Sequence, residues 1–312
     1  MTAQGRAGAL PILALAVIGA AWGATQPLGK IAVSEGYRHF GLLFWQMGLG
    51  AIILQGVMAL RGRRLSFAPQ HLRLYLIIAV VGSILPGIAS YNAAVHLPAG
   101  ILSILLSSVP MLAFPIALLL RLERFRMRRL LGLSLGLLGI ALLILPDTQM
   151  PRSVQVLWIP VALLSSLCYA FEGNFVAKWG RAGLGPVELL AGSSTLGALL
   201  CLPLAMASDQ FIDPGLPWGA PDLALVASSF LHAGAYSGYV WLVGVAGSVF
   251  AVQVSYFVTL FGVSWAMLFL GEGYSGWIWA ALAAMLAGMA LVQPRPHALV
   301  ATAATRQNAT PQ

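Results

Sequence analysis

The chain has 312 residues, of which 59% are hydrophobic and only 8% are charged, and its formal net charge is +8. Soluble domains carry about 25% charged residues, so a soluble protein of this composition would expose extensive apolar surface and aggregate. The basic residues occur in short clusters between apolar runs rather than along one soluble face, which argues against a nucleic-acid partner. The composition therefore predicts an integral membrane protein whose main solvent is the lipid bilayer.

Apolar runs of about 20 residues predict membrane-spanning helices, because a backbone in lipid must satisfy its own hydrogen bonds. The chain contains about ten such runs, at 9–33, 40–60, 72–95, 98–120, 129–146, 154–177, 185–207, 221–245, 248–270 and 274–292. Met1–Gln26 also resembles a cleaved signal peptide, but the apolar run continues through Val33 and is interpreted as an uncleaved first helix. The tail 293–312 is expected to be flexible.

Lysine and arginine in the short connections predict how the helices are oriented in the membrane. The basic residues of the connections after the second, fourth and sixth spans and of both tails are Arg6, Arg61, Arg63, Arg64, Arg73, Arg121, Arg124, Arg126, Arg128, Arg129, Lys178, Arg181, Arg295 and Arg306. The opposite side receives Asp147, Asp209, Asp213, Asp222 and Glu272. This distribution predicts a multi-pass protein of the plasma (inner) membrane with both termini in the cytoplasm.

The sequence also contains an internal repeat. Shifting it by 149 positions places Glu123 on Glu272 and Gly139 on Gly288, with the edges of the apolar runs coinciding. Each half has an odd number of spans, so the halves must face opposite ways, an arrangement typical of secondary transporters with a substrate site between the halves. An old duplication in a passive membrane protein is the alternative. The two inverted five-helix repeats are predicted at 9–146 and 154–292.

Several short motifs follow one another in order along residues 9–292. They are Ala21-Trp22-Gly23 through Lys30, Ala94 to Gly100, Pro110, Leu122-Glu123-Arg124-Phe125, Gly132, Gly136, Gly139, Gly271-Glu272 and Gly288. Together they resemble the ten-helix EamA-type branch of the drug/metabolite transporter superfamily. The resemblance implies an exporter of amino acids, related metabolites or drugs, with the fifth and tenth helices bracing a central cavity. Thr259 departs from the pattern, because the first half has Pro110 at the equivalent position. This difference makes the inferred substrate less specific.

Glu172 is the most informative single residue. It precedes the end of the sixth span by about six residues, or about 9 Å of helix. A charge at the centre of a span costs about 2.5–3.5 kcal/mol, so such residues usually face a polar cavity. Glu172 is therefore predicted to bind a coupling proton or a substrate ammonium. The alternative is a carboxylate that snorkels to the interface or pairs with Lys178. Lys30 and Lys178 lie at equivalent helix ends and are interpreted as snorkelling anchors.

Other candidates for the cavity are polar or aromatic. His232, Tyr236 and Tyr239 are spaced i, i+4 and i+7, so they share one helix face, and His232 can titrate near physiological pH. A packed aromatic stripe is the alternative interpretation of that face. The remaining candidates at cavity depth are Trp22, Gln26, Tyr91, Asn92, Ser107, Asn174, Gln253 and Tyr256. Tyrosine and tryptophan also form belts at the membrane–water interfaces, and this is the alternative interpretation of the aromatic candidates.

The sequence contains no phosphate-cradling loop and no zinc-protease motif. Cys168 and Cys201 lie inside apolar runs without nearby ligand partners, so no metal, cofactor or enzymatic activity is expected. Without an ATPase signature, the driving energy is expected to come from an ion gradient, with the proton as the candidate coupling ion, or from the solute gradient itself. The sequence therefore predicts a secondary transporter that exports small organic solutes by alternating access, with a flippase for a lipid-linked substrate as the alternative. The oligomeric state is left open.

Overall fold

The computed structural model of the chain describes residues 3–143, 152–246 and 248–292. These residues form helices joined by short connections and contain no strand. The elements are α1 (Ala3–Val33), α2 (His39–Leu60), α3 (Pro69–Ala79), the π-helical turn η1 (Val80–Ile84), α4 (Leu85–His96), α5 (Ala99–Leu106), α6 (Val109–Leu119), α7 (Met127–Leu143), α8 (Arg152–Trp179), α9 (Pro186–Ala207), α10 (Ala220–Ala246), α11 (Ser248–Ala251), α12 (Val254–Leu270) and α13 (Gly276–Val292).

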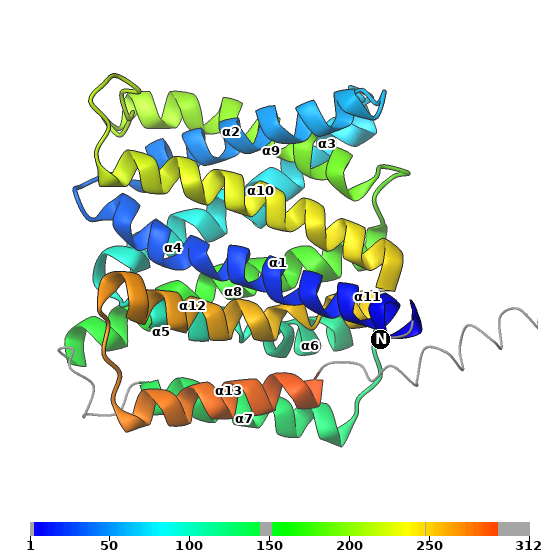
Figure 1. Ribbon diagram of the computed structural model, residues 1–312, viewed down its shortest axis with the longest axis vertical. Helices are drawn as coiled ribbons and strands as arrows, with labels where there is room; N and C mark the ends of the chain where they lie inside the picture. Colours follow the sequence, from blue (N-terminus) through cyan, green and yellow to red (C-terminus); the bar gives the residue numbers. More distant parts are fainter. Residues whose placement is uncertain (1–2, 144–151, 247, 293–312) are drawn as a thin grey trace, which may run out of the picture.

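The helices lie side by side, with their connections at two opposite ends of the molecule (Figure 1). Within the described ranges, six helical segments are long and apolar enough to cross a membrane, and α12 and α13 are shorter apolar helices. We refer to the end at which α2, α6 and α8 stop as the basic face, because Arg61, Arg121 and Arg181 follow these helices. The opposite end, which carries Asp209 and Glu272, is the acidic face. The predicted all-α membrane fold is confirmed.

The two halves interlock through their first helices. α1 packs along α10 and α12, and α8 packs along α4 and α6. In the order of spans, each half therefore places its first span against the third and fourth spans of the other half. This exchange is the arrangement expected of two repeats that are related by inversion, and it puts α1, α4, α8 and α10 around the middle of the bundle.

Three of the predicted spans are interrupted. The π turn η1 separates α3 from α4, and short turns at Ser107-Ser108 and Val252-Gln253 divide the fourth and ninth spans. Pro110 explains the first of these turns, because proline lacks an N–H and is tolerated in the first turn of a new helix. The turn before α12 occurs without a proline. Pro110 therefore marks the break before α6 in the sequence, and Pro86 lies in the first turn of α4, directly after η1.

α7 and α13 pair at one edge of the bundle (Figure 1). Their backbones touch, because a Cβ on Gly132 would lie 2.6 Å from the carbonyl oxygen of Gly288, and a Cβ on Gly288 would lie 2.6 Å from that of Gly132. Small residues allow such close approach between membrane helices. The fifth and tenth spans thus form a pair held by reciprocal glycine contacts.

Lys30 and Lys178 both bond to backbone carbonyls at helix ends. Lys30 Nζ on α1 donates to three carbonyl oxygens at the end of α4 and just beyond it, at 2.6, 3.2 and 3.1 Å. Lys178 Nζ on α8 donates to Leu120 O, just after α6, at 2.7 Å. A cation near a helix C-terminus is favourable because the last carbonyls lack helical partners. Beyond snorkelling, these lysines therefore connect neighbouring helices.

Glu272 joins the end of α12 to the start of α5 at the acidic face. Its two carboxylate oxygens accept hydrogen bonds from the backbone N–H groups of Ala99 at 2.7 Å and Gly100 at 3.1 Å. The hydroxyl of Tyr274 donates to the same carboxylate. The first N–H groups of a helix have no partner within the helix and attract negative charge, so Glu272 caps α5 from a distant part of the chain.

We expect Glu272→Ala to lower the stability of the folded protein by about 2 kcal/mol, because charge-assisted hydrogen bonds to otherwise unpaired N–H groups are lost. Thermal unfolding in detergent measures the effect. Glu123→Ala is the matched control, since Glu123 is the repeat-related residue and forms an ion pair with Arg129 at 2.9 Å near the basic face. Partly exposed pairs contribute about 0–1 kcal/mol. Equal losses in the two variants would contradict the capping role.

Candidate functional site

Four of the predicted residues meet where α1 packs along α10. Trp22 Nε1 donates a hydrogen bond to His232 Nδ1 at 3.2 Å, so that ring nitrogen is unprotonated. The Trp22 ring also lies edge-on to Tyr236 and Tyr239, with ring centroids 6.4 and 6.0 Å apart. All four side chains are half-buried. The face of α10 indicated by the sequence spacing therefore contacts one tryptophan of α1.

Glu172 lies on α8 with its carboxylate against Gly82 of the π turn η1. It is within electrostatic range of the hydroxyls of Tyr169, one turn earlier on α8, and of Tyr236 on α10. No hydrogen bond or salt bridge joins its carboxylate to another side chain of the described residues. The alternative pairing with Lys178 is not formed, because that ammonium bonds to the carbonyl after α6.

Tyr236 links these two groups of residues. Its ring contacts Trp22, and its hydroxyl is within electrostatic range of Glu172. A carboxylate beside aromatic rings favours cations, because the ring faces and the carboxylate both attract positive charge. The arrangement is therefore suited to an ammonium group or to the uptake and release of a proton.

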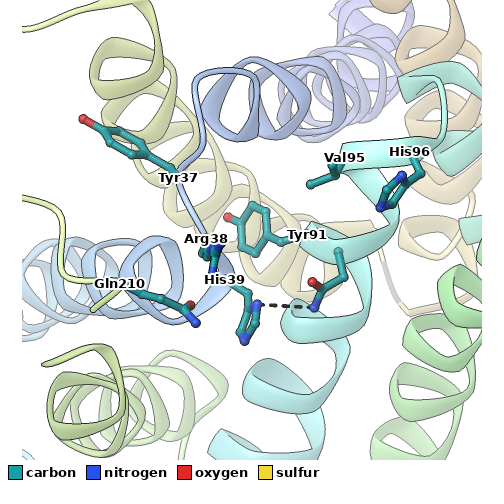
Figure 2. Close-up of a pocket in the computed structure, with 8 residues that line it drawn as sticks. Tyr37, Arg38, His39, Tyr91, Val95, His96 and Gln210 are labelled. Carbon is teal, nitrogen blue, oxygen red and sulfur yellow. Dashed lines mark hydrogen bonds between the residues drawn. The ribbon is translucent and has the colours of Figure 1, made fainter. Parts of the chain in front are cut away.

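A cavity of about 240 Å³ opens near the acidic face. Its lining residues are Tyr37, Arg38, His39, Tyr91, Asn92, Val95, His96 and Gln210. In Figure 2, Arg38, His39 and Gln210 lie on one side of Tyr91 and His96 lies on the other. Only Tyr91 and Asn92 were predicted from the sequence. The other polar residues come from connections and helix ends, where the sequence pattern carries no signal of a cavity.

Hydrogen bonds order the walls of this cavity. Tyr91 Oη donates to Gln46 Oε1 at 2.9 Å, and Asn92 Nδ2 lies 3.3 Å from His39 Nδ1. At the rim, Tyr37 Oη donates to Asp222 Oδ1 at 2.7 Å, which together with burial raises the pKa of Tyr37 to about 12. Because the Tyr37 hydroxyl keeps its proton at physiological pH, this bond between the α1–α2 connection and α10 persists there.

A line of polar groups leads from this cavity toward the basic face. Tyr91 at the cavity is within electrostatic range of Tyr169, which is in turn within range of Glu172. Tyr236 continues the line and is within range of Arg181 beyond the end of α8. Sequence reasoning missed Tyr169, although its spacing of three residues from Glu172 places both on one helix face. Apart from Arg181, these polar groups belong to α4, α8 and α10.

The other predicted residues lie elsewhere. The buried Ser107 hydroxyl, in the turn after α5, donates to Ile104 O at 2.7 Å, and Asn174 Nδ2 donates to carbonyls of α6 and α8 at 3.0 and 2.8 Å. Gln253 immediately precedes α12, and Tyr256 is within electrostatic range of Arg128 on α7. Gln26 follows Trp22 by one turn of α1. Among the described residues, no hydrogen bond or ring contact joins these side chains to Glu172.

The described side chains include no group of three or more histidine, cysteine or acidic residues placed to hold a metal ion. Cys168 and Cys201 are free thiols, half-buried and buried respectively. The functional groups described around α8 and α10 are the carboxylate of Glu172, the imidazole of His232 and the aromatic side chains of Trp22, Tyr236 and Tyr239.

We expect Trp22→Phe to weaken solute affinity about fivefold, because one hydrogen bond worth about 1 kcal/mol no longer orients His232. Half-saturation in a proteoliposome exchange assay measures this change. The matched control is Trp265→Phe, which removes an indole donor to the carbonyl of Ala20 on α1 at 3.0 Å but does not contact His232. An equal effect of the control would show that Trp22 acts only through helix packing.

Comparison with known proteins identifies the family. The sequence profile of the EamA-like transporter family matches the chain twice, at residues 9–145 and 156–293. A protein of known crystal structure shares the fold with a TM-score of 0.60 and 18% sequence identity, over 92% of this chain and 97% of that one. The comparison with curated proteins finds no match. Because the family profile covers both halves and nearly the whole chain, the chain belongs to the EamA-like transporter family, a group of membrane transporters of the drug/metabolite type that carry small solutes.

Proposed function

We propose that the protein is a secondary transporter that exports a small organic solute, an amino acid or a related metabolite, across the plasma (inner) membrane. The observation that carries this proposal is Glu172, a carboxylate inside a membrane span with no ion-pair partner among the described side chains. A charge in that position is costly, so a carboxylate that is retained there usually marks a proton or substrate site. Tyr236 is within electrostatic range of this carboxylate, and Trp22 contacts Tyr236, so aromatic rings near the carboxylate make the site suitable for the ammonium group of an amine or amino acid.

The architecture supports alternating access as the mechanism. The two halves exchange their first helices, and the fourth and ninth spans are both interrupted, the fourth near its middle and the ninth near its start. Discontinuous helices at the interface of inverted repeats are typical of secondary transporters, since the repeats offer two nearly equivalent packings. We place the basic face, and with it both termini, in the cytoplasm because arginine and lysine concentrate there.

Contacts across the acidic face support a state that is held together on that side. Lys30 joins α1 to the end of α4, Glu272 joins α12 to α5, and Tyr37 joins the α1–α2 connection to α10. Export would require these contacts to loosen as the solute leaves. The cavity beside Tyr91 then lies on the proposed route of release.

Counterflow in proteoliposomes tests the proposed function. Liposomes preloaded with one unlabelled amino acid or related metabolite at a time receive the labelled form outside, and protein-free liposomes serve as the control. A carrier produces transient accumulation of the label for its own substrate class. Folded, correctly inserted protein that moves no solute under any imposed gradient would refute the proposal. Movement of fluorescent lipids alone would favour a flippase for lipid-linked substrates.

A further inference from the structure

The π turn in the third span is a local asymmetry between the two halves. Residues Val80–Ile84 form η1, whereas the corresponding span of the second half, α10, is a continuous α-helix over Ala220–Ala246. π turns are rare, and they frequently occur at functional sites because they shift the backbone and change which side chains face a neighbour. η1 packs directly against α8, the helix that carries Glu172.

Gly82 lies at the centre of this turn and is in contact with the Glu172 carboxylate. A Cβ built on Gly82 would lie 2.6 Å from Glu172 Cδ and 2.8 Å from each carboxylate oxygen. The nearly equal distances show that the plane of the carboxylate faces the glycine. All three of the nearest atoms belong to this one side chain, so the space that a Cβ would need is taken by the Glu172 carboxylate.

We infer that Gly82 and its π turn form the seat of the Glu172 carboxylate, and that Gly82 is a positioning residue for the exchange of a proton or an ammonium group at that site. This inference rests on the proposed transport function. Glycine inside a helical segment costs about 0.5–1 kcal/mol relative to alanine, so the absence of a side chain at this position needs a local reason. The close contact with Glu172 supplies that reason.

The proton affinity of the Glu172 carboxylate depends on its position, because few other titratable groups lie around it. The titratable groups in its range are Tyr169 on its own helix and Tyr236 on α10. Among the described elements packed against α8, α4 contributes Tyr91, which faces Tyr169, and His96, which stacks on Trp158 with ring centroids 3.9 Å apart. η1, α5 and α6 contribute no titratable side chain. A shift of the carboxylate changes its distance from Tyr236 without a compensating charge nearby.

Gly82→Ala tests the inference. The three atoms nearest to the new methyl group all belong to the movable end of one side chain, so we expect a folded protein with a displaced carboxylate. The expected result is a shift of about one pH unit in the midpoint of the pH profile of counterflow, equivalent to a tenfold change in proton affinity. Gly173→Ala is the matched control, because it adds a methyl group next to Glu172 where no atom lies within 4 Å.

Rescue by a shorter acid separates positioning from general damage. In the double variant Gly82→Ala/Glu172→Asp, the carboxylate is one methylene shorter and clears the new methyl group, so the pH profile should return toward that of the original protein. A folded Gly82→Ala protein with an unchanged profile, or a double variant that shows no recovery, would overturn the inference. An equal shift in Gly173→Ala would overturn it as well.

Carbodiimide labelling gives a readout that does not depend on transport. The reagent modifies accessible protonated carboxyl groups, and peptide mass spectrometry reports the rate at Glu172 as a function of pH. We expect Gly82→Ala to change this rate and Gly173→Ala to leave it unchanged. If the original protein moves no solute but labelling responds in this way, the positioning of Glu172 by Gly82 is supported and the proposed transport function is refuted. If transport is present but labelling is identical in all variants, the proposed role of Gly82 in positioning Glu172 is refuted.

Discussion

Glu172→Gln is expected to lower solute transport roughly 30- to 160-fold and to remove its dependence on pH. Glutamine has nearly the same shape, so the contact with Gly82 and the packing of α8 are retained. It is uncharged at every pH, so it neither releases a proton nor attracts an ammonium group. The loss of a charge-assisted interaction worth about 2–3 kcal/mol gives this range of rates.

The form of the loss distinguishes the two roles of the carboxylate. If Glu172 couples transport to protons, the variant should still exchange labelled for unlabelled solute but no longer accumulate solute when a pH gradient is imposed. If Glu172 binds the ammonium group of the solute, exchange itself should fall. The two assays can be run on the same proteoliposomes, so differences in protein insertion do not affect the comparison.

Glu123→Gln is the matched control for this variant. It removes the same charge from a residue that pairs with Arg129 near the basic face, in the connection between α6 and α7. We expect its transport rate and pH profile to match those of the original protein. A Glu172→Gln protein with unchanged rate and unchanged pH profile would contradict the assignment of Glu172 to the transport site.

The spans were predictable because the physical constraint on them is strong. Lipid requires long apolar helices, so the apolar runs located the helices, and the spacing of His232, Tyr236 and Tyr239 put them on one face of α10. Their partner Trp22 is 210 positions from His232 in the chain, so only the fold could show that they meet. Features within one helix could therefore be predicted from the sequence, whereas contacts between helices could not.

The π turn and the cavity residues illustrate what the sequence does not reveal. Val80–Ile84 is a short apolar stretch with one glycine and one serine, and its contact with α8 is visible only in the fold. Arg38 and Gln210 lie in connections, whose position over the helices depends on the whole bundle. The role of Gly82 needed the distance to the Glu172 carboxylate, because a glycine in a membrane helix is usually explained by helix packing alone.

Gly288→Leu is expected to prevent stable folding of the protein, with a cost of at least about 3 kcal/mol. A Cβ at Gly288 meets the carbonyl oxygen of Gly132 at 2.6 Å, and this atom belongs to backbone that cannot rotate away. Met111 Sδ, 3.0 Å from the same position, closes the other side. Overpacking costs about 1–3 kcal/mol even where side chains can yield, and here α7 and α13 would have to separate.

Size-exclusion chromatography and thermal unfolding in detergent measure this effect. Gly276→Leu is the matched control, because Gly276 begins the same helix and no atom lies within 4 Å of a Cβ built there. Gly288→Ala should fall between the original protein and Gly288→Leu, since it adds only the first clashing atom. If Gly288→Leu remained monodisperse and melted at the original temperature, the pair formed by the fifth and tenth spans would be adaptable rather than closely packed. A rigid pair predicts that destabilisation increases with side-chain size at Gly288 and not at Gly276.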